Sequence, residues 1–127
     1  MADYVLGIDQ STQGTKALLF DGAGHLLDRA DLSHRQMVNE KGWVEHDPMQ
    51  IYYNTVEVVK ILVEKAGIDK SEIRTLGISN QRETAIVWDK ESGLPIYNAV
   101  VWQCARGSKI CERLENQGKA ELVRSHT

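Results

Sequence analysis

Short apolar runs with alternating polar positions occupy the first quarter of the chain. They cover residues 4–8, 16–20 and 26–32, and the segment Asp21-Gly22-Ala23-Gly24 between the last two has the composition of a tight turn. A period of two residues is typical of a strand that has one face in the core. The pattern therefore predicts an antiparallel meander of three strands at the start of the chain.

A helical period follows in the middle of the chain. Asp47 is suited to cap a helix, Pro48 fits its first turn, and Gln50 stands where a capping box places a glutamine. The apolar positions that repeat at helical spacing after these signals are Tyr52, Val56, Val59, Val63 and Ala66. Gly67 is a residue that readily ends a helix, so we predict one long helix between Asp47 and Gly67.

The second half of the chain contains further strand and helix signals. The expected elements are strands at Thr75–Ser79, Thr84–Asp89 and near Ala99–Trp102, a turn at Lys90–Gly93, and helices at about Ser108–Gln117 and Ala120–Arg124. A hairpin followed by a long helix and another strand favours a crossover that places the later strand parallel to the first. The predicted fold class is α/β, with a ribonuclease H-like mixed sheet and flanking helices.

Composition limits the size and the partners of the protein. A chain of 127 residues with 42% hydrophobic residues has enough apolar surface for one small core, so we expect a single domain. A net charge of -3 without a basic run argues against nucleic acid and anionic membrane surfaces as partners. Asp3 stands where a signal peptide carries positive charge, and Cys104 and Cys111 have no partner at metal-ligand spacing. These features indicate a cytoplasmic protein with reduced thiols.

The most informative polar residues follow the strand predicted at Thr75–Ser79. Arg82 and Glu83 are adjacent charges in an otherwise apolar region. An arginine donates paired hydrogen bonds to neighbouring oxygens, a carboxylate accepts from hydroxyls, and Trp102 would offer a flat apolar wall. The combination suits a small polyhydroxy compound, and the competing interpretation is an ordinary exposed ion pair beside a buried tryptophan.

A polar loop joins the first two predicted strands and reads Asp9-Gln10-Ser11-Thr12-Gln13-Gly14-Thr15-Lys16. Its small hydroxyl residues and Gly14 would allow backbone N–H groups to approach an anion, and Lys16 would balance phosphate charge. Asp9 would hold a water molecule on Mg²⁺. The loop is therefore interpreted as a phosphate-binding hairpin, with an ordinary polar turn as the alternative.

Four segments together resemble the N-terminal part of the FGGY carbohydrate kinases, most closely the glycerol kinase branch of that family. They are GIDQSTQGTKALLFD, GWVEHDP, NQRETAIVWDKESGLPIYNAVVWQ and ICERL. The first of these is shared across the wider actin-like ATPase superfamily. The resemblance implies magnesium-dependent transfer of the γ-phosphate of ATP to a terminal hydroxyl of glycerol, in a cleft between two lobes with ribonuclease H-like cores.

The resemblance also implies roles for individual residues. It places Arg82, Glu83 and Trp102 on the polyol substrate, and Asp9 near a metal-bound water. The residues that it places on the phosphates of ATP are Thr12, Gln13, Gly14 and Lys16.

The chain departs from the glycerol kinase branch at several of these positions. Gln13 and Gly14 stand where hydroxyl residues are more frequent, and Lys16 stands where arginine is frequent. Cys104-Ala105-Arg106 replaces an aspartate and two arginines, so one cation is missing. These departures affect the details of the nucleotide site more than the fold.

The family's chains are several times longer than this one, and their catalytic base, an aspartate, lies beyond the position of Thr127. We therefore expect residues 1–127 to be the N-terminal part of a first lobe, without a catalytic residue and inactive alone. The expected partners are a small-molecule polyol and the remainder of the kinase chain. Apolar surface left open for that remainder would also permit self-association into a homo-oligomer.

Two other classes of function stay open. A ribonuclease H-like nuclease would use Asp9, but it needs several carboxylates around two metals and a basic face, which the net negative charge does not favour. A non-catalytic actin-like module is the other class. Within the kinase interpretation, other polyols or ketoses are alternative acceptors. Glu45 is expected to hold its loop, and His46 to be a surface or packing residue, since no second metal ligand lies near it in sequence.

Overall fold

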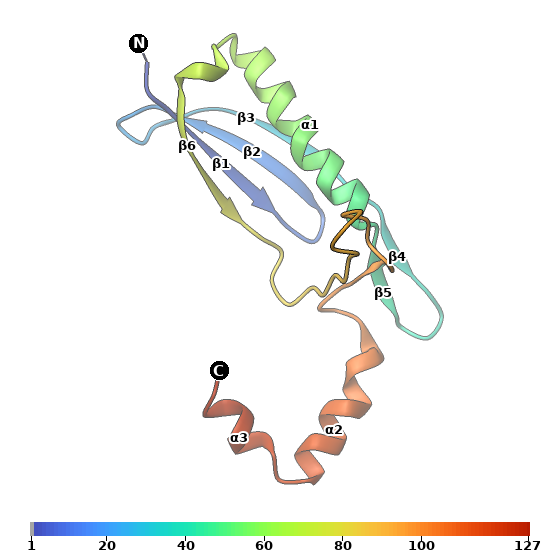
Figure 1. The fold of residues 1–127 in the computed structure, drawn as a ribbon. Helices are drawn as coiled ribbons and strands as arrows, with labels where there is room; N and C mark the ends of the chain where they lie inside the picture. The colour runs from blue at the N-terminus through green and yellow to red at the C-terminus, as the bar shows by residue number, and fades with distance from the viewer. Residues whose placement is uncertain (1) are drawn as a thin grey trace.

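Four strands form the main sheet of the protein in a computed structural model that describes residues 2–127 (Figure 1). β1 (Tyr4–Gln10), β2 (Gly14–Phe20) and β3 (Leu26–Ser33) form an antiparallel meander. β6 (Ile73–Ser79) lies parallel to β1, which gives the order β3-β2-β1-β6. The predicted meander, the crossover and the mixed sheet are confirmed.

Helix α1 (Pro48–Ala66) lies in the crossover that leads from β3 to β6, and it has the boundaries that its end signals predict. The carboxylate of Asp47 accepts a hydrogen bond of 2.9 Å from a backbone N–H of the first turn, and Gly67 ends the helix in the left-handed conformation with φ of 63°. The predicted capping box is wrong, because the side chain of Gln50 instead accepts from the backbone N–H of Arg35 at 2.9 Å.

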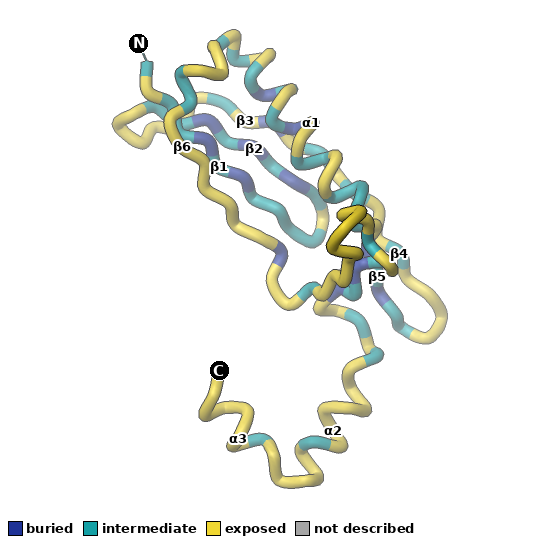
Figure 2. Tube along the Cα trace, in the orientation of Figure 1, coloured by how far each residue is buried: buried dark blue, intermediate teal, exposed yellow. Residues whose placement is uncertain are grey.

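The core lies between α1 and one face of the main sheet. Figure 2 shows buried positions on β1, β2 and the helix, where the two layers face each other. The residues of this core are Leu6, Ala17, Leu19, Ala30, Val58 and Leu62. Full burial of a leucine contributes about 1.5–3 kcal/mol, so this packing fixes β1 and β2 against the helix and thereby the loop ends that follow them.

A second, smaller sheet has the order β4-β5-β7 and contains β4 (Gln36–Val38), β5 (Val44–His46) and β7 (Ala99–Val100). The sequence pattern did not predict the β4–β5 hairpin, because three residues are too few to show a period. The available signal was Gly42, which has φ of 73° in the turn between the two strands.

The strand predicted at Thr84–Asp89 is wrong. Ala85 exchanges two backbone hydrogen bonds with Val100, whereas Trp88 forms an isolated bridge with Pro95. The segment thus changes partner after a few residues, and a proline cannot donate to a ladder, so no continuous strand forms. Trp88 is 62% exposed and does not join the core.

The C-terminal helices agree closely with their predicted positions. Helix α2 spans Ser108–Asn116 and α3 spans Ala120–Arg124, and Figure 1 shows both extending away from the sheets. Short 3₁₀ turns at η1 (Lys70–Glu72) and η2 (Ala105–Gly107) precede β6 and α2. Cys104 and Cys111 are both free thiols.

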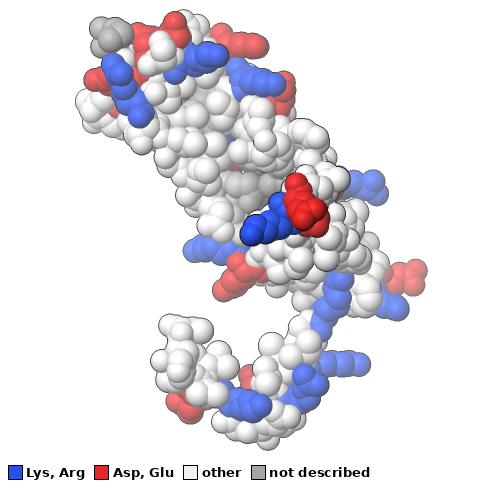
Figure 3. Space-filling view, viewed as in Figure 1, with Lys and Arg blue, Asp and Glu red and all other residues white. Residues whose placement is uncertain are grey.

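Charged side chains of both signs are intermixed on the surface. Figure 3 shows Lys and Arg beside Asp and Glu over the visible face of the molecule. This distribution agrees with the small net charge of -3. Within residues 2–127, every helix is too short or too polar to cross a bilayer.

Candidate functional site

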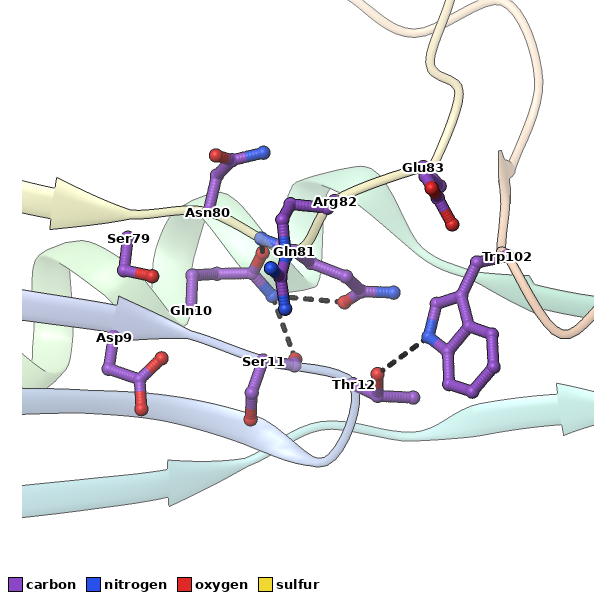
Figure 4. A pocket seen from close by; sticks show the side chains of 10 residues that line it. All are labelled: Asp9, Gln10, Ser11, Thr12, Ser79, Asn80, Gln81, Arg82, Glu83 and Trp102. Atoms are coloured by element: carbon purple, nitrogen blue, oxygen red, sulfur yellow. Dashed lines mark hydrogen bonds between the residues drawn. The ribbon is translucent and has the colours of Figure 1, made fainter. Parts of the chain in front are cut away.

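A pocket of about 500 Å³ lies where the parallel strands β1 and β6 end together. The last paired residues of the two strands are Asp9 and Ser79, so the segments that follow leave the sheet side by side. Figure 4 shows the pocket with Asp9 at one end and Trp102 at the other. The residues that line it are Asp9, Gln10, Ser11, Thr12, Ser79, Asn80, Gln81, Arg82, Glu83 and Trp102. The fold thus joins the two segments singled out in the sequence.

The three residues predicted to bind a polyol all line this pocket. Trp102 is 54% exposed and is therefore not the buried tryptophan of the competing interpretation. Among the ion pairs of residues 2–127, none includes Arg82 or Glu83. Both charged groups are exposed and available to a ligand.

Glu83 is the one residue other than glycine with a positive φ in the described part of the chain, at 57°. A side chain with a Cβ is disfavoured there, and such strained residues cluster at ligand sites. The left-handed turn allows two consecutive charged residues to leave the end of β6 toward one pocket, which an extended strand would send to opposite faces.

Trp102 also contacts the hairpin on the other side of the pocket. Its indole N–H donates a hydrogen bond of 3.0 Å to the hydroxyl oxygen of Thr12 (Figure 4). The Thr12 hydroxyl acts as the acceptor, which leaves its own proton free to be donated to an anion. Within residues 2–127, the backbone N–H groups of Thr12 and Gln13 form no backbone hydrogen bond.

The predicted phosphate cradle is divided by the structure. Thr12 lines the main pocket, whereas Gln13, Gly14 and Lys16 line a separate hollow of about 110 Å³. Lys16 lies directly opposite Asp9 in the β1–β2 ladder, and its ammonium nitrogen is 3.8 Å from the Asp9 carboxylate. Lys16 therefore does not line the main pocket, but it lies next to Asp9, which does.

Packing against β3 requires a glycine at position 14, which the sequence alone did not show. A Cβ at this position would lie 2.4 Å from the backbone oxygen of Leu32 on β3. The backbone oxygen of Gly14 accepts hydrogen bonds from the backbone N–H and the hydroxyl of Ser11, at 2.9 and 3.1 Å, which close the turn. The glycine is thus required by the close approach of β3, whatever it does for an anion.

Asp9 is the candidate contact for Mg²⁺. Its side chain is 46% exposed at the end of the pocket. The described residues contain no group of three or more His, Cys, Asp or Glu side chains that would hold a metal ion by themselves. A single carboxylate nevertheless fits Mg²⁺, which keeps several waters and takes its other ligands from substrate phosphates.

Two glutamines at the site were not singled out by the sequence pattern. The backbone N–H of Gln81 donates to the side-chain oxygen of Gln10 at 3.0 Å, and the Gln10 amide donates back to the side-chain oxygen of Gln81 at 3.2 Å. The sequence offered one signal for their role: Gln10 and Gln81 each follow a predicted strand, and the two strands are predicted to be parallel. These bonds join the two segments that form the pocket floor.

A pair of histidines lies behind Gln81, of which His46 is fully buried and His34 half-buried. The rings of His34 and His46 pack edge to face with centroids 4.6 Å apart, and Nδ1 of His46 is 3.5 Å from the Gln81 amide nitrogen. Burial lowers the pKa of both histidines. His46 is 0% exposed, so of the two predicted alternatives, a surface or a packing residue, the structure shows packing.

Glu45 holds its loop, as the sequence predicts. Its carboxylate accepts hydrogen bonds of 3.1 Å from Tyr97 and from Arg106, and Arg106 lies 4.5 Å from the ring centroid of Trp43. Burial raises the pKa of Glu45, but the bonds from Tyr97, Asn98 and Arg106 outweigh it and leave the pKa below its ordinary value. The remaining cation of the Cys104-Ala105-Arg106 segment therefore has a structural role.

The mixed sheet, its crossover helix and the pocket at the ends of β1 and β6 define a domain of the actin-like ATPase fold. A family model described as the N-terminal domain of the FGGY family of carbohydrate kinases matches residues 4–127. The chain belongs to the FGGY family of carbohydrate kinases and corresponds to its N-terminal domain.

Individual relatives agree with this assignment. Glycerol kinase 1 of Thermotoga maritima is 48% identical over 124 residues, which are 98% of this chain and 25% of that protein. The structure of Plasmodium falciparum glycerol kinase with ADP matches with a TM-score of 0.76 at 35% identity, over 89% of this chain and 23% of that one. Gluconate kinase from Lactobacillus acidophilus shares the fold, with a TM-score of 0.87 at 24% identity, over 97% of this chain and 24% of that one. The chain thus spans about a quarter of the length of these relatives.

Proposed function

We propose that residues 1–127 are the N-terminal part of the first lobe of an ATP-dependent polyol kinase that phosphorylates a terminal hydroxyl of glycerol. The main support is the pocket in which Arg82 and Glu83, which form no ion pair within residues 2–127, lie beside Trp102, at the edge where Thr12 and Asp9 also lie. The high identity to glycerol kinases over nearly the whole chain favours glycerol as the acceptor.

The acceptor side of the reaction follows from the chemistry of three side chains. The Arg82 guanidinium donates hydrogen bonds to hydroxyl oxygens, and the Glu83 carboxylate accepts from hydroxyl protons. Trp102 contacts the carbon edge of the polyol and excludes water from one side. Together they bind and orient one terminal hydroxyl, and orientation of this kind accounts for much of the rate in phosphoryl transfer.

The phosphate side is formed by the β1–β2 hairpin. The hydroxyl of Thr12 and the backbone N–H groups of Thr12 and Gln13, which form no backbone hydrogen bond within residues 2–127, donate to phosphate oxygens, with support from the charge of Lys16. Asp9 would hold Mg²⁺ through water, and the bound ion would neutralise charge on the phosphates. Asp9 and Glu83 are thus both occupied, so the general base is expected outside residues 1–127.

A kinase of another polyol or ketose is the second candidate. The pocket of about 500 Å³ has room for an acceptor longer than three carbons. The wall that would limit acceptor length from this side is Trp102.

An acceptor panel tests the proposal. The full-length kinase that carries this N-terminal sequence is assayed with ATP and glycerol, erythritol, xylulose or gluconate, and the phosphorylated product is measured. We expect the largest kcat/KM with glycerol. A larger value with a four- to six-carbon acceptor would replace glycerol by that acceptor, and no product with any of the four would overturn the polyol kinase assignment.

A further inference from the structure

Gln81 is a buried polar residue between exposed neighbours in the pocket. The residue is 8% exposed, whereas Asn80 and Arg82 on either side are exposed. Burial of an amide is unfavourable unless its donors and acceptor find hydrogen-bond partners. The hydrogen-bond partners of Gln81 therefore identify the segments that this buried side chain holds together.

The first set of partners joins β6 to β1. Gln81 and Gln10 exchange two hydrogen bonds, and the Gln10 amide also donates to the backbone oxygen of Ser11 at 3.0 Å. The backbone ladder between the two strands ends at Asp9 and Ser79. The glutamine pair continues the connection beyond the ladder, through side chains (Figure 4).

The second set of partners brackets the two charged residues. The Gln81 amide nitrogen donates to the hydroxyl oxygen of Thr84 at 3.0 Å. Arg82 and Glu83 lie between these two bonded residues, and Glu83 has the left-handed φ of 57°. The same amide nitrogen lies 3.5 Å from Nδ1 of the fully buried His46. A short bridge from residue 81 to residue 84 thus closes the turn that holds Glu83 in a disfavoured conformation.

We propose that Gln81 is a positioning residue for the acceptor, acting through the backbone of Arg82 and Glu83; this inference rests on the proposed function. Neither charged side chain has an ion pair within residues 2–127 to fix its direction. Their direction toward the pocket therefore depends on the turn between residues 81 and 84. Loss of the bridge lets Glu83 relax to a negative φ, which turns its carboxylate away from an acceptor hydroxyl.

The test uses the full-length kinase with Gln81→Leu, which removes the amide and keeps a side chain of similar size. We expect the KM for the acceptor to rise about tenfold or more while the KM for ATP changes less than threefold. A second pair of variants changes only the other end of the bridge: Thr84→Val removes the hydroxyl and keeps the shape, and Thr84→Ser keeps the hydroxyl. Thr84→Val should raise the acceptor KM at least threefold, and Thr84→Ser should restore the wild-type value.

The matched control is Gln50→Leu, which also removes a side-chain hydrogen bond, to the backbone N–H of Arg35, but away from the pocket. Its acceptor KM should stay within twofold of wild type. A fall in thermal stability of Gln81→Leu and Thr84→Val with an unchanged acceptor KM would show a purely structural role and overturn the inference.

Failure of the proposed function has a different signature. If wild type prefers another acceptor to glycerol, the series is run with that acceptor and the same shifts are expected. An enzyme that phosphorylates no polyol overturns both statements, whereas an active wild type with unaffected variants overturns only the role of Gln81.

Discussion

The indole N–H of Trp102 donates a hydrogen bond of 3.0 Å to the hydroxyl oxygen of Thr12, 90 positions earlier in the chain. The bond connects the wall proposed for the acceptor with the hairpin proposed for the phosphates. Because the Thr12 oxygen accepts this bond, its proton is directed elsewhere and is available to a phosphate oxygen. The Trp102 side chain thus contacts both the proposed acceptor site and the proposed phosphate site.

Trp102→Phe separates the two contacts of this side chain, because it keeps an aromatic wall and removes the N–H donor. A neutral hydrogen bond contributes roughly 0.5–1.4 kcal/mol, so we expect the KM for ATP to rise about two- to tenfold. The KM for glycerol should stay within twofold. Steady-state kinetics of the full-length kinase measure both values. Trp88→Phe, at an exposed tryptophan outside the pocket, is the matched control and should change neither. A shift in the glycerol KM alone would contradict the assignment of the N–H to the phosphate side.

Arg82→Ala and Glu83→Gln test the acceptor contacts directly. Each should reduce kcat/KM for glycerol by about ten- to a thousandfold, the effect of losing roughly 1.4–4 kcal/mol of transition-state stabilisation. The KM for ATP should change little, because neither residue lies on the hairpin. Glu83→Gln keeps the size of the side chain and its backbone conformation, so the fall in kcat/KM of this variant measures the effect of the negative charge. Equal losses in the kinetics of ATP and glycerol would indicate general damage to the pocket.

Lys16→Ala tests the charge beside Asp9. We expect the KM for ATP to rise roughly three- to thirtyfold, since an exposed charge is partly screened by solvent, with the glycerol KM nearly unchanged. Lys65→Ala is the control, because Lys65 also pairs with an aspartate, Asp28, at 2.6 Å and lies outside both hollows. If the glycerol KM moved instead, the two halves of the site would be reversed.

Half-buried His34 and buried His46 make stability depend on pH. Burial lowers the pKa of His34 and His46, so the folded chain stays neutral there while the unfolded chain binds protons below about pH 6.5. The contribution of the two neutral histidines to the free energy of unfolding is therefore fully present above that pH. It decreases as the pH falls toward the lowered pKa values. The loss between pH 7.5 and 5.5 is at most about 1.4 kcal/mol for each histidine.

Urea unfolding of the 127-residue chain at several pH values from 7.5 to 5.5 measures this loss. The carboxyl groups with shifted pKa, such as Glu45 and Asp28, have lowered values and titrate below the chosen window. His46→Phe keeps a ring against His34 and removes one titrating group, so the slope of stability against pH should decrease. The same slope in His46→Phe and wild type would contradict the prediction.

The 127-residue chain alone should form no glycerol 3-phosphate from ATP and glycerol. The carboxylates at the pocket, Asp9 and Glu83, are assigned to metal-bound water and acceptor, which leaves no general base. The measurement is product formation by the purified chain. Activity that Glu83→Gln abolishes would contradict the prediction, whereas activity that this variant leaves unchanged would identify a contaminating kinase.

Local pattern was sufficient for the elements that local interactions decide. The meander, the crossover helix with Asp47 and Gly67 at its ends, and the C-terminal helices follow from periods and end signals within a few residues. The parallel neighbours β1 and β6 also follow, since a helix of this length returns the chain beside its first strand. The structure then shows that Asp9 and Arg82 line one pocket at the edge where these two strands end.

The sequence by itself determined the fold class and the chemistry available at that edge, and the tertiary structure decided how the chemistry is arranged. The bond between Trp102 and Thr12 and the pairing of Gln10 with Gln81 join residues 90 and 71 positions apart, and no local period reports such contacts. The left-handed Glu83 lies within the bridge from buried Gln81 to Thr84, in a conformation that a residue with a Cβ does not favour by itself. Local propensities act over a turn or a strand, whereas these positions are set by packing between elements distant in the chain.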